Sequence, residues 1–369
     1  MAAQALPGPR STAAWARLRV LVVDDSFVVR ELMSRWIGAE PGLEVVGTAK
    51  NGRDALRLVD ELRPDIVLLD LEMPDGDGLT VLPGLLARRP DLSVVIVSTL
   101  TQRNAELSLR CLALGAVDYV PKPTTRGSSA GSLDFRGELL AKLSSLAGRH
   151  GGDRAAIRLP PRSEPRETRV TASARKARLV VIGASTGGPR AITNVLLGLA
   201  EVSRQVPILL LQHMPAVFTA AFARSVADET GLAVAEAENG EPLRPGRVYV
   251  APGGRHLGLF APSGTPLARL VEGPAVQHCR PSLDILFADA ARLFGPGCLG
   301  VVLTGMGSDG TEGAKAVVQA GGTILAQDEG TSIVWGMPGS IVRHGLARAV
   351  LPIGSIAGAV ADLVGGRVA

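Results

Sequence analysis

Five polar residues in the first half of the chain lie at or just after the ends of short apolar runs. In chain order they are Asp24, Asp25, Asp70, Ser98 and Lys122. Carboxylates held close together repel, and a hard divalent cation with oxygen ligands is the usual remedy, Mg²⁺ above all where a phosphoryl oxygen completes the octahedron. An aspartate that accepts a phosphoryl group also needs a hydroxyl group and a cation around it. The five residues therefore predict a magnesium-dependent phosphoryl-acceptor site with Asp70 as the nucleophile.

A structural explanation of the same residues is that Asp24-Asp25-Ser26 caps the following helix and that Lys122 is a solvated charge. Their joint occurrence at strand ends favours the phosphoryl site. Adjacent strand residues point to opposite faces, so either Ser98 or Thr99 supplies the hydroxyl group. Ser98 is the predicted one because it follows the apolar run directly.

A second group of reactive residues lies in the other half of the chain. The apolar run 179–182 leads into a G-x-S-x-G turn that contains Ser185 and would raise its hydroxyl group above a sheet. A hydroxyl nucleophile needs a base, and the base needs a group that orients it. His213 follows the run 208–211, and Asp309 lies in the Gly-rich turn after the run 299–303. These three residues predict ester or amide hydrolysis by a Ser-His-Asp mechanism.

Alternatives exist for each member of this group. A Gly-rich turn before a helix also suits phosphates, but this one matches neither G-x-G-x-x-G nor the P-loop. A lone histidine is more often structural, and Asp309 would also serve as a turn cap. The other histidines (His150, His256, His278 and His344) lie in the linker or near turns and helix ends. The chain order Ser, His, Asp differs from the order of α/β-hydrolases.

The elements that would position these residues alternate between strands and helices. Apolar runs at 20–23, 43–47, 66–69, 94–97 and 119–120 predict strands, and amphipathic segments at 28–37, 52–62, 79–87 and 103–114 predict helices between them. The same rhythm returns after residue 178, with strands at 179–182, 208–211, 248–250, 299–303 and 323–326. The fold class is therefore α/β, with two doubly wound parallel sheets.

The stretch between the two halves differs from both in composition. Residues 149–177 carry eight basic and three acidic residues, a net charge of +5, while the whole chain of 369 residues carries +4. We predict an N-terminal extension over 1–16, a first domain over 17–148, a Pro/Arg-rich flexible linker over 149–177 and a second domain over 178–369. Only 3% of the residues are aromatic and the basic stretch has none, which argues against nucleic-acid binding.

Residues 17 to about 147 resemble the receiver domain of two-component response regulators, a flavodoxin-like fold. The resemblance rests on three segments: 21–26, which ends in Asp24-Asp25-Ser26; 70–74, which begins at Asp70; and Lys122-Pro123. It implies Mg²⁺ bound by Asp24, Asp25 and Asp70, phosphorylation of Asp70, and a switch formed by Ser98 and Lys122. Gly76 departs from the pattern, since a bulky residue often stands there.

The second half, 178–365, resembles the catalytic domain of the chemotaxis protein-glutamate methylesterases, with a Rossmann-like three-layer fold. The segments that carry the resemblance are 183–188, 211–215, 251–253, 280–282, 303–310, 326–329 and 336–338. By this resemblance the triad is Ser185, His213 and Asp309, and Thr186 and Met306 lie beside the oxyanion pocket. Cys279 departs from the pattern, which has a histidine or another polar residue before Arg280.

The combined resemblance implies a phosphorylation-regulated enzyme of chemotaxis adaptation. It would hydrolyse glutamate γ-methyl esters on methyl-accepting chemoreceptors to glutamate and methanol, and would also deamidate receptor glutamines. Its phosphodonor would be the chemotaxis histidine kinase, with Mg²⁺ needed for phosphorylation and no cofactor for the ester chemistry. The alternative function is a phospho-receiver signalling adaptor whose hydrolase domain is silent.

The three cysteines, Cys111, Cys279 and Cys298, are far apart in sequence and predict neither a disulfide framework nor a zinc knuckle. No apolar run approaches the ~20 residues that cross a bilayer, and the N-terminus lacks the apolar core of a signal peptide. We therefore expect a cytoplasmic protein with no direct membrane insertion.

Overall fold

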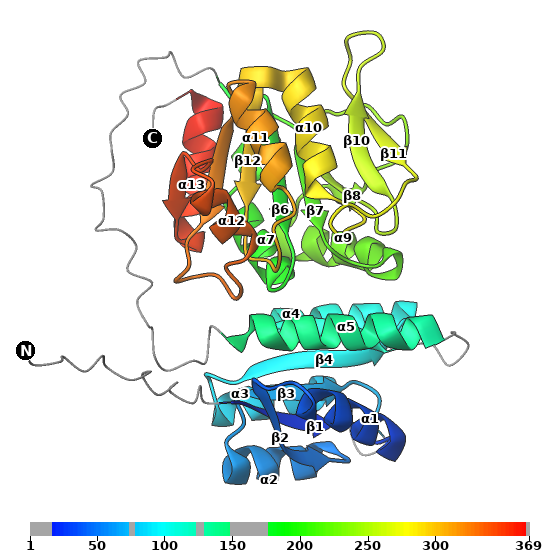
Figure 1. Ribbon diagram of the computed structural model, residues 1–369. Helices are drawn as coiled ribbons and strands as arrows, with labels where there is room; N and C mark the ends of the chain where they lie inside the picture. Colours follow the sequence, from blue (N-terminus) through cyan, green and yellow to red (C-terminus); the bar gives the residue numbers. More distant parts are fainter. Residues whose placement is uncertain (1–16, 74–77, 123–128, 148–175, 367–369) are drawn as a thin grey trace, which may run out of the picture.

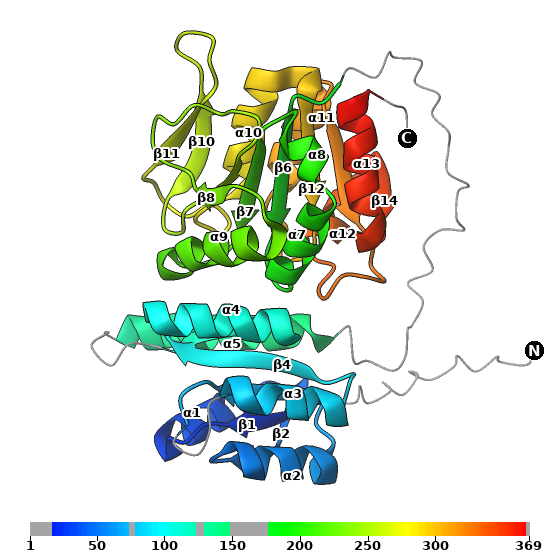
Figure 2. The same ribbon diagram turned by 180° about the vertical axis from the view of Figure 1, so that it is seen from behind.

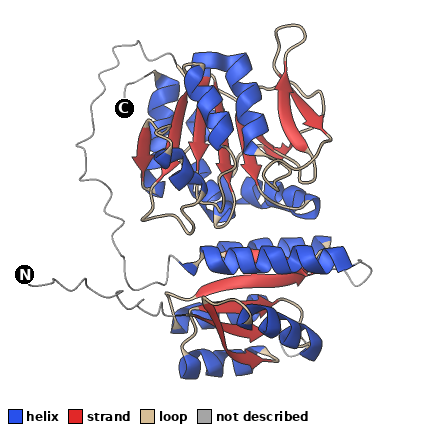
Figure 3. Cartoon of the chain, in the orientation of Figure 1, coloured by secondary structure: helices blue, strands red, loops and turns tan. Residues whose placement is uncertain are grey.

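In the computed structural model, which describes residues 17–73, 78–122, 129–147 and 176–366, the chain forms two separate parallel sheets. Helices cover both faces of each sheet (Figures 1 and 3). The α/β class and the two doubly wound sheets predicted from the sequence are confirmed. No helix of the described residues is long and apolar enough to span a membrane.

The N-terminal sheet has the strand order β2-β1-β3-β4-β5, with every neighbouring pair parallel. The five predicted strands are all present, each extended by one to three residues. The strands and helices are β1 (Leu18–Val23), α1 (Phe27–Gly38), β2 (Leu43–Ala49), α2 (Gly52–Leu62), β3 (Ile66–Asp70), α3 (Gly78–Arg88), β4 (Ser93–Thr99), α4 (Gln102–Leu114), β5 (Asp118–Lys122) and α5 (Ser129–Ser145).

Local sequence explains where these helices begin. The side chains of Ser26, Asn51 and Thr101 each accept a hydrogen bond from a backbone N–H in the first turn of α1, α2 and α4. Such caps satisfy N–H groups that have no partner within the helix. The expectation that Ser26 caps a helix is therefore correct, while Asp24 and Asp25 remain available for another role.

The C-terminal sheet has the order β14-β13-β12-β6-β7-β9-β8, again with all pairs parallel. Its elements are β6 (Leu179–Ala184), α7 (Gly188–Leu197), α8 (Ala200–Ser203), β7 (Ile208–Gln212), α9 (Ala216–Thr230), β8 (Val234–Glu236), β9 (Val248–Val250), α10 (Leu283–Phe294), η1 (Gly295–Gly297), β12 (Cys298–Val302), α11 (Thr311–Gln319), β13 (Thr323–Gln327), α12 (Met337–Arg343), β14 (Ala349–Leu351) and α13 (Ile353–Gly365).

Four strands of this half were not predicted. The edge strands β8 and β14 have only three residues each, too few to show a period. The other two, β10 (His256–Phe260) and β11 (Leu267–Val271), pair as an antiparallel hairpin beside the sheet. Charged residues such as Arg269 interrupt the apolar pattern of β11, because one face of the hairpin is open to solvent.

The two halves touch through helices. In both views of the molecule, α4 and α5 form the layer that faces α7 and α9 (Figures 1 and 2), and α4 contacts α7 and α9. Buried apolar residues of the two halves join one cluster, which includes Leu112, Tyr119, Phe218 and Phe222. Almost the whole predicted linker and the N-terminal extension lie outside the described residues, so the four domain boundaries stay predictions.

Candidate functional sites

The first predicted site lies at the carboxyl edge of the N-terminal sheet, where β1, β3 and β5 end. Lys122 Nζ lies 2.6 Å from Asp24 Oδ2 and 2.8 Å from Asp70 Oδ2, and both carboxylates are buried. Asp25 is exposed, but one of its oxygens lies within 4.8 Å of ligand atoms of Asp24 and Asp70. Four of the five residues selected from the sequence therefore share one pocket.

The charges of this pocket suit a hard cation. Burial raises the pKa of Asp70 to about 6, an effect that Lys122 reduces and Asp24 reinforces. Burial alone would lower the pKa of Lys122, but the carboxylates of Asp70 and Asp24 outweigh it and raise that pKa. The buried Oδ2 of Asp24 has the Lys122 ammonium, 2.6 Å away, as its partner. Oxygen donors with this geometry and charge fit Mg²⁺.

Ser98 and Thr99 differ in their surroundings. Ser98 is fully buried, and its hydroxyl group lies 3.1 Å from that of Ser108 on α4. Thr99 instead donates to Glu72 and accepts from Asn104. The structure thus ties Ser98 to the helix that faces the other domain, and its role as the switch hydroxyl stays a prediction. Gly76 lies outside the described residues.

The serine turn connects β6 to α7. Gly187 has φ +75°, and a side chain on Gly188 would collide with the Gln212 amide, so the turn requires both glycines. Ser185 is partly exposed. Thr186 is buried, and its hydroxyl group has no hydrogen-bond partner among the described residues. A buried polar atom without a partner beside the predicted nucleophile is a candidate substrate contact.

His213 follows the neighbouring strand. Ala184 pairs with Gln212 between β6 and β7, so Ser185 and His213 leave the sheet side by side. His213 Nε2 lies 2.8 Å from Asp309 Oδ2, which unites the predicted base and its orienting carboxylate. Within the described residues no hydrogen bond joins the Ser185 hydroxyl group to His213. The other ring nitrogen, Nδ1, faces Cys279 Sγ at 3.8 Å.

Asp309 is held at the start of α10. Its carboxylate accepts hydrogen bonds from the Ser282 hydroxyl group at 2.7 Å and from the Leu283 and Asp284 N–H groups at 2.7 and 3.2 Å. Burial alone would raise the pKa of Asp309, but His213 and these donors outweigh it and lower that pKa. Burial alone would lower the pKa of His213. The contacts of His213 with Asp309 and Cys279 outweigh that effect and raise the pKa of His213 to about 9.

Thr186 and Met306, predicted beside the oxyanion pocket, carry backbone N–H groups that donate no hydrogen bond to any described residue. Met306 also packs on an apolar cluster that contains Val334 together with Phe135 and Leu139 of α5. The candidate oxyanion region therefore borders the N-terminal domain.

Sequence reasoning missed the residues that hold the site together. Thr304 donates to the Thr186 carbonyl at 2.9 Å and accepts from the Val334 N–H at 3.0 Å. Gln212 donates to the Ser185 carbonyl at 2.9 Å. Both follow predicted strands, so a search of strand ends for amide and hydroxyl side chains would have found them. His256, which the sequence placed near a turn or helix end, is the buried first residue of β10, and its Nδ1 accepts from the Ser282 N–H.

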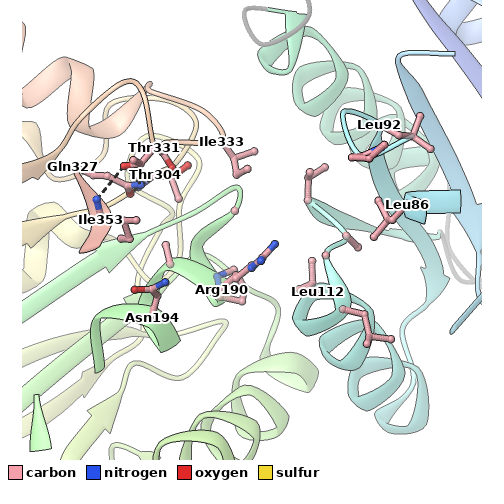
Figure 4. A pocket seen from close by; sticks show the side chains of 18 residues that line it. Leu86, Leu92, Leu112, Arg190, Asn194, Thr304, Gln327, Thr331, Ile333 and Ile353 are labelled. Carbon is pink, nitrogen blue, oxygen red and sulfur yellow. Dashed lines mark hydrogen bonds between the residues drawn. The ribbon is translucent and has the colours of Figure 1, made fainter. Parts of the chain in front are cut away.

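A cavity of about 480 Å³ lies between the two domains next to the serine turn. Gly187 and Thr304 line it on one side, and Leu86, Leu92 and Leu112 line it on the other. Arg190 extends from α7 toward the N-terminal domain across this space (Figure 4). The predicted nucleophile thus lies on a turn that borders the domain interface.

The fold and the two polar sites define a class of protein in which a receiver-type α/β domain is joined to a Rossmann-like hydrolase domain. Residues 20–129 match the family described as "Response regulator receiver domain", and residues 180–360 match "CheB methylesterase". The chain therefore belongs to the CheB methylesterase family, as the sequence resemblance predicted. It is an ester hydrolase that carries a receiver domain.

Similar proteins cover nearly the whole chain. A relative from Rhodopseudomonas palustris (strain HaA2), "Protein-glutamate methylesterase/protein-glutamine glutaminase", is 44% identical over 92% of either chain. A relative of the same description, numbered 2, from Caulobacter vibrioides is 46% identical over 92% of this chain and 96% of its own length. The crystal structure of the Thermotoga maritima CheB methylesterase catalytic domain matches 52% of this chain and all of its own, with 40% identity and a TM-score of 0.50.

Proposed function

We propose that this protein hydrolyses glutamate γ-methyl esters on methyl-accepting chemoreceptors in the cytoplasm, and that it also deamidates receptor glutamines. The observation that carries the proposal is the contact of His213 with the buried Asp309 carboxylate, one strand away from the serine turn. The names of the relatives support the two substrates. Both reactions pass through the same acyl-enzyme, with methanol or ammonia as the leaving group.

In this mechanism the Ser185 hydroxyl oxygen attacks the ester carbonyl carbon and its proton passes to His213 Nδ1, because Nε2 faces Asp309. Hydrogen bonds between nucleophile and base are often long before substrate binds and tighten only in the complex. The free N–H groups of Thr186 and Met306 would hold the oxyanion. His213 then returns the proton to the departing methanol and activates the water that releases glutamate.

Methanol release from a methylated chemoreceptor fragment tests the enzyme. We expect Ser185→Ala to lower the rate by at least about 10³-fold, as loss of a triad member does elsewhere. Ser225→Ala is the matched control, since among the described residues the Ser225 hydroxyl group bonds to Glu229 of the same helix, α9. Wild-type methanol release by Ser185→Ala would remove the nucleophile from the proposal. Ammonia release from a glutamine-containing fragment tests deamidation separately.

The receiver domain is proposed to control access to this site through phosphorylation of Asp70 by a chemotaxis histidine kinase. Mg²⁺ held by Asp24, Asp25 and Asp70 would neutralise charge on the phosphoryl group when bound. Ser98 and Lys122 would hold phosphoryl oxygens. Ser98 already contacts Ser108 on α4, which packs on α7 and α9, so a movement of Ser98 toward Asp70 would loosen the layer that faces the serine turn.

A second connection supports the same control. Val334 lies in an apolar cluster with Phe135 and Leu139 of α5, and its N–H donates to Thr304. Thr304 in turn donates to the carbonyl of Thr186, the residue after the nucleophile. A shift of α5 would therefore move the candidate oxyanion region through two hydrogen bonds.

A small phosphodonor with Mg²⁺ tests this regulation. We expect the donor to raise methanol release by the wild type and to have no effect on Asp70→Asn. The control Asp60→Asn should keep the full response, because Asp60 pairs with Arg88 at the surface. An equal response in Asp70→Asn would contradict receiver control without affecting the esterase proposal.

A further inference from the structure

The nitrogen of His213 that would accept the Ser185 proton faces a thiol. Cys279 Sγ lies 3.8 Å from Nδ1, and the Asp309 carboxylate lies behind the ring at Nε2. A zinc ion lies about 2.3 Å from a thiolate sulfur and about 2.0–2.1 Å from an imidazole nitrogen, so its two ligands are about 3.5 to 3.8 Å apart for angles between tetrahedral and trigonal. The observed separation fits a shared ion.

The Asp309 carboxylate contacts His213 in the way that carboxylates contact zinc-bound histidines in other proteins. Zinc-bound histidines usually donate their other ring N–H to a carboxylate, which fixes the tautomer and raises the basicity of the ligand nitrogen. The Asp309 carboxylate accepts a hydrogen bond from His213 Nε2, and it also accepts hydrogen bonds from the Ser282 hydroxyl group and the Leu283 N–H. The other ring nitrogen, Nδ1, therefore faces Cys279.

The thiol is held in place by a strained turn. Gln277 and His278 both have positive φ, +48° and +64°, between the paired residues Val276 and Cys279. Residues other than glycine adopt this conformation only where their surroundings impose it, often at functional sites. The Gln277 amide supplies the restraint, because it donates to Asp284 at 2.9 Å and accepts from Ser308 at 2.8 Å.

We propose that His213 Nδ1 and Cys279 Sγ bind one zinc ion and that zinc blocks the hydrolase site. Both side chains are partly exposed with the two domains in contact, so an ion reaches them from solvent. The thiol proton and the proton on His213 Nδ1 are both released to solvent on binding, and water fills the other coordination positions. A sulfur and an imidazole nitrogen select zinc over magnesium, which separates this site from the carboxylates at Asp70.

Binding is tested without substrate, by titration of the reduced full-length chain with Co²⁺ in the presence of excess Mg²⁺. We expect a cobalt–thiolate charge-transfer band that saturates at one equivalent and disappears when Zn²⁺ is added. Cys279→Ser should abolish the band. The control His278→Asn, which removes the exposed imidazole of the same turn and tolerates positive φ, should keep it. A band that persists in Cys279→Ser, or no band in the wild type, would overturn the site.

Inhibition rests on the proposed function and is measured separately. Each variant's methanol release in Zn²⁺ is compared with its own rate in a chelator. The zinc concentration for half-inhibition should rise by at least about 10- to 100-fold in Cys279→Ser, since even partners outside the first coordination sphere contribute that much to affinity. Cobalt binding without inhibition by zinc would overturn the blocking role. If the wild type releases no methanol in chelator, the esterase proposal is contradicted. The cobalt titration then still decides whether the metal site exists.

Discussion

Tyr119 of β5 and Phe218 of α9 stack face to face across the domain interface, with ring centroids 4.2 Å apart and planes 12° from parallel. Tyr119 lies three residues before Lys122, and Phe218 lies five residues after His213. The Lys142 ammonium lies over the Tyr119 ring, 4.8 Å from its centroid. The stack therefore connects the end of the receiver sheet to the helix that follows the candidate base.

Weakening this stack should release the hydrolase from receiver control. Aromatic pairs contribute about 0.5–1.5 kcal/mol beyond their buried area, so Phe218→Leu should raise methanol release without phosphodonor by about 2- to 10-fold. Tyr119→Phe keeps both rings and should leave that rate near the wild-type value. Thermal unfolding of both variants checks that the hydrolase domain is intact. An unchanged basal rate in a folded Phe218→Leu protein would show that the stack does not restrain the enzyme.

Ser108→Ala should make activation easier. The Ser98 hydroxyl group bonds to Ser108 at 3.1 Å in this structure, and turning toward a phosphoryl group on Asp70 would break that bond. A neutral hydrogen bond contributes about 0.5–1.5 kcal/mol, so the phosphodonor concentration for half-activation should fall by about 2- to 10-fold. Ser98→Ala should respond in the opposite way and lose most of the activation. A Ser98→Ala protein that is activated normally would transfer the switch role to Thr99.

Thr304→Val should damage the serine turn without touching the triad. The substitution keeps the shape of the side chain but leaves the buried Val334 N–H and Thr186 carbonyl without their partner. Each buried group left unpaired costs about 1–3 kcal/mol, so we expect a lower melting temperature and a lower kcat. Thr323→Val is the control, because the partly buried Thr323 side chain forms no hydrogen bond within the described chain. Equal melting temperatures and kcat values in the two variants would contradict the role of Thr304.

The activity should rise with pH. The pKa of His213 is raised from 6.5 to about 9, and only the neutral imidazole can accept the Ser185 proton. Activity at saturating phosphodonor should therefore increase through pH 9. Because the pKa is higher in the folded than in the unfolded chain, the stability that protonated His213 contributes is complete below pH 6.5 and is lost as the pH rises through about 9.

Asp309→Asn provides the check on that pH profile. Loss of the carboxylate removes the charge that raises the pKa of His213, so the residual activity should reach its plateau at a lower pH. The plateau activity of Asp309→Asn should be about 10⁴-fold below that of the wild type, as in other triads that lose the orienting carboxylate. An unshifted profile in Asp309→Asn would assign the rise in activity to another group.

Much of this molecule could be read from the sequence because its main signals are local. Buried parallel strands appear as short apolar runs, and their carboxyl ends meet at one sheet edge whatever their separation in the chain. That rule places Asp24, Asp70 and Lys122 in one pocket, and it places Ser185 and His213 at one edge of the other sheet. The edge strands β8 and β14 were not predicted, because three residues are too few to show a hydrophobic period.

Contacts made by loops and contacts between the domains were decided only by the tertiary structure. Thr304 reaches the serine turn from the end of β12, Val334 bonds to Thr304 from a later loop, and Cys279 reaches His213 from a turn 66 residues away. The stack of Tyr119 on Phe218 exists only because the two domains pack together. Such contacts depend on how loops cross and domains dock, which hydrophobic periodicity does not encode. The sequence determined which groups do chemistry, and packing decided what controls them.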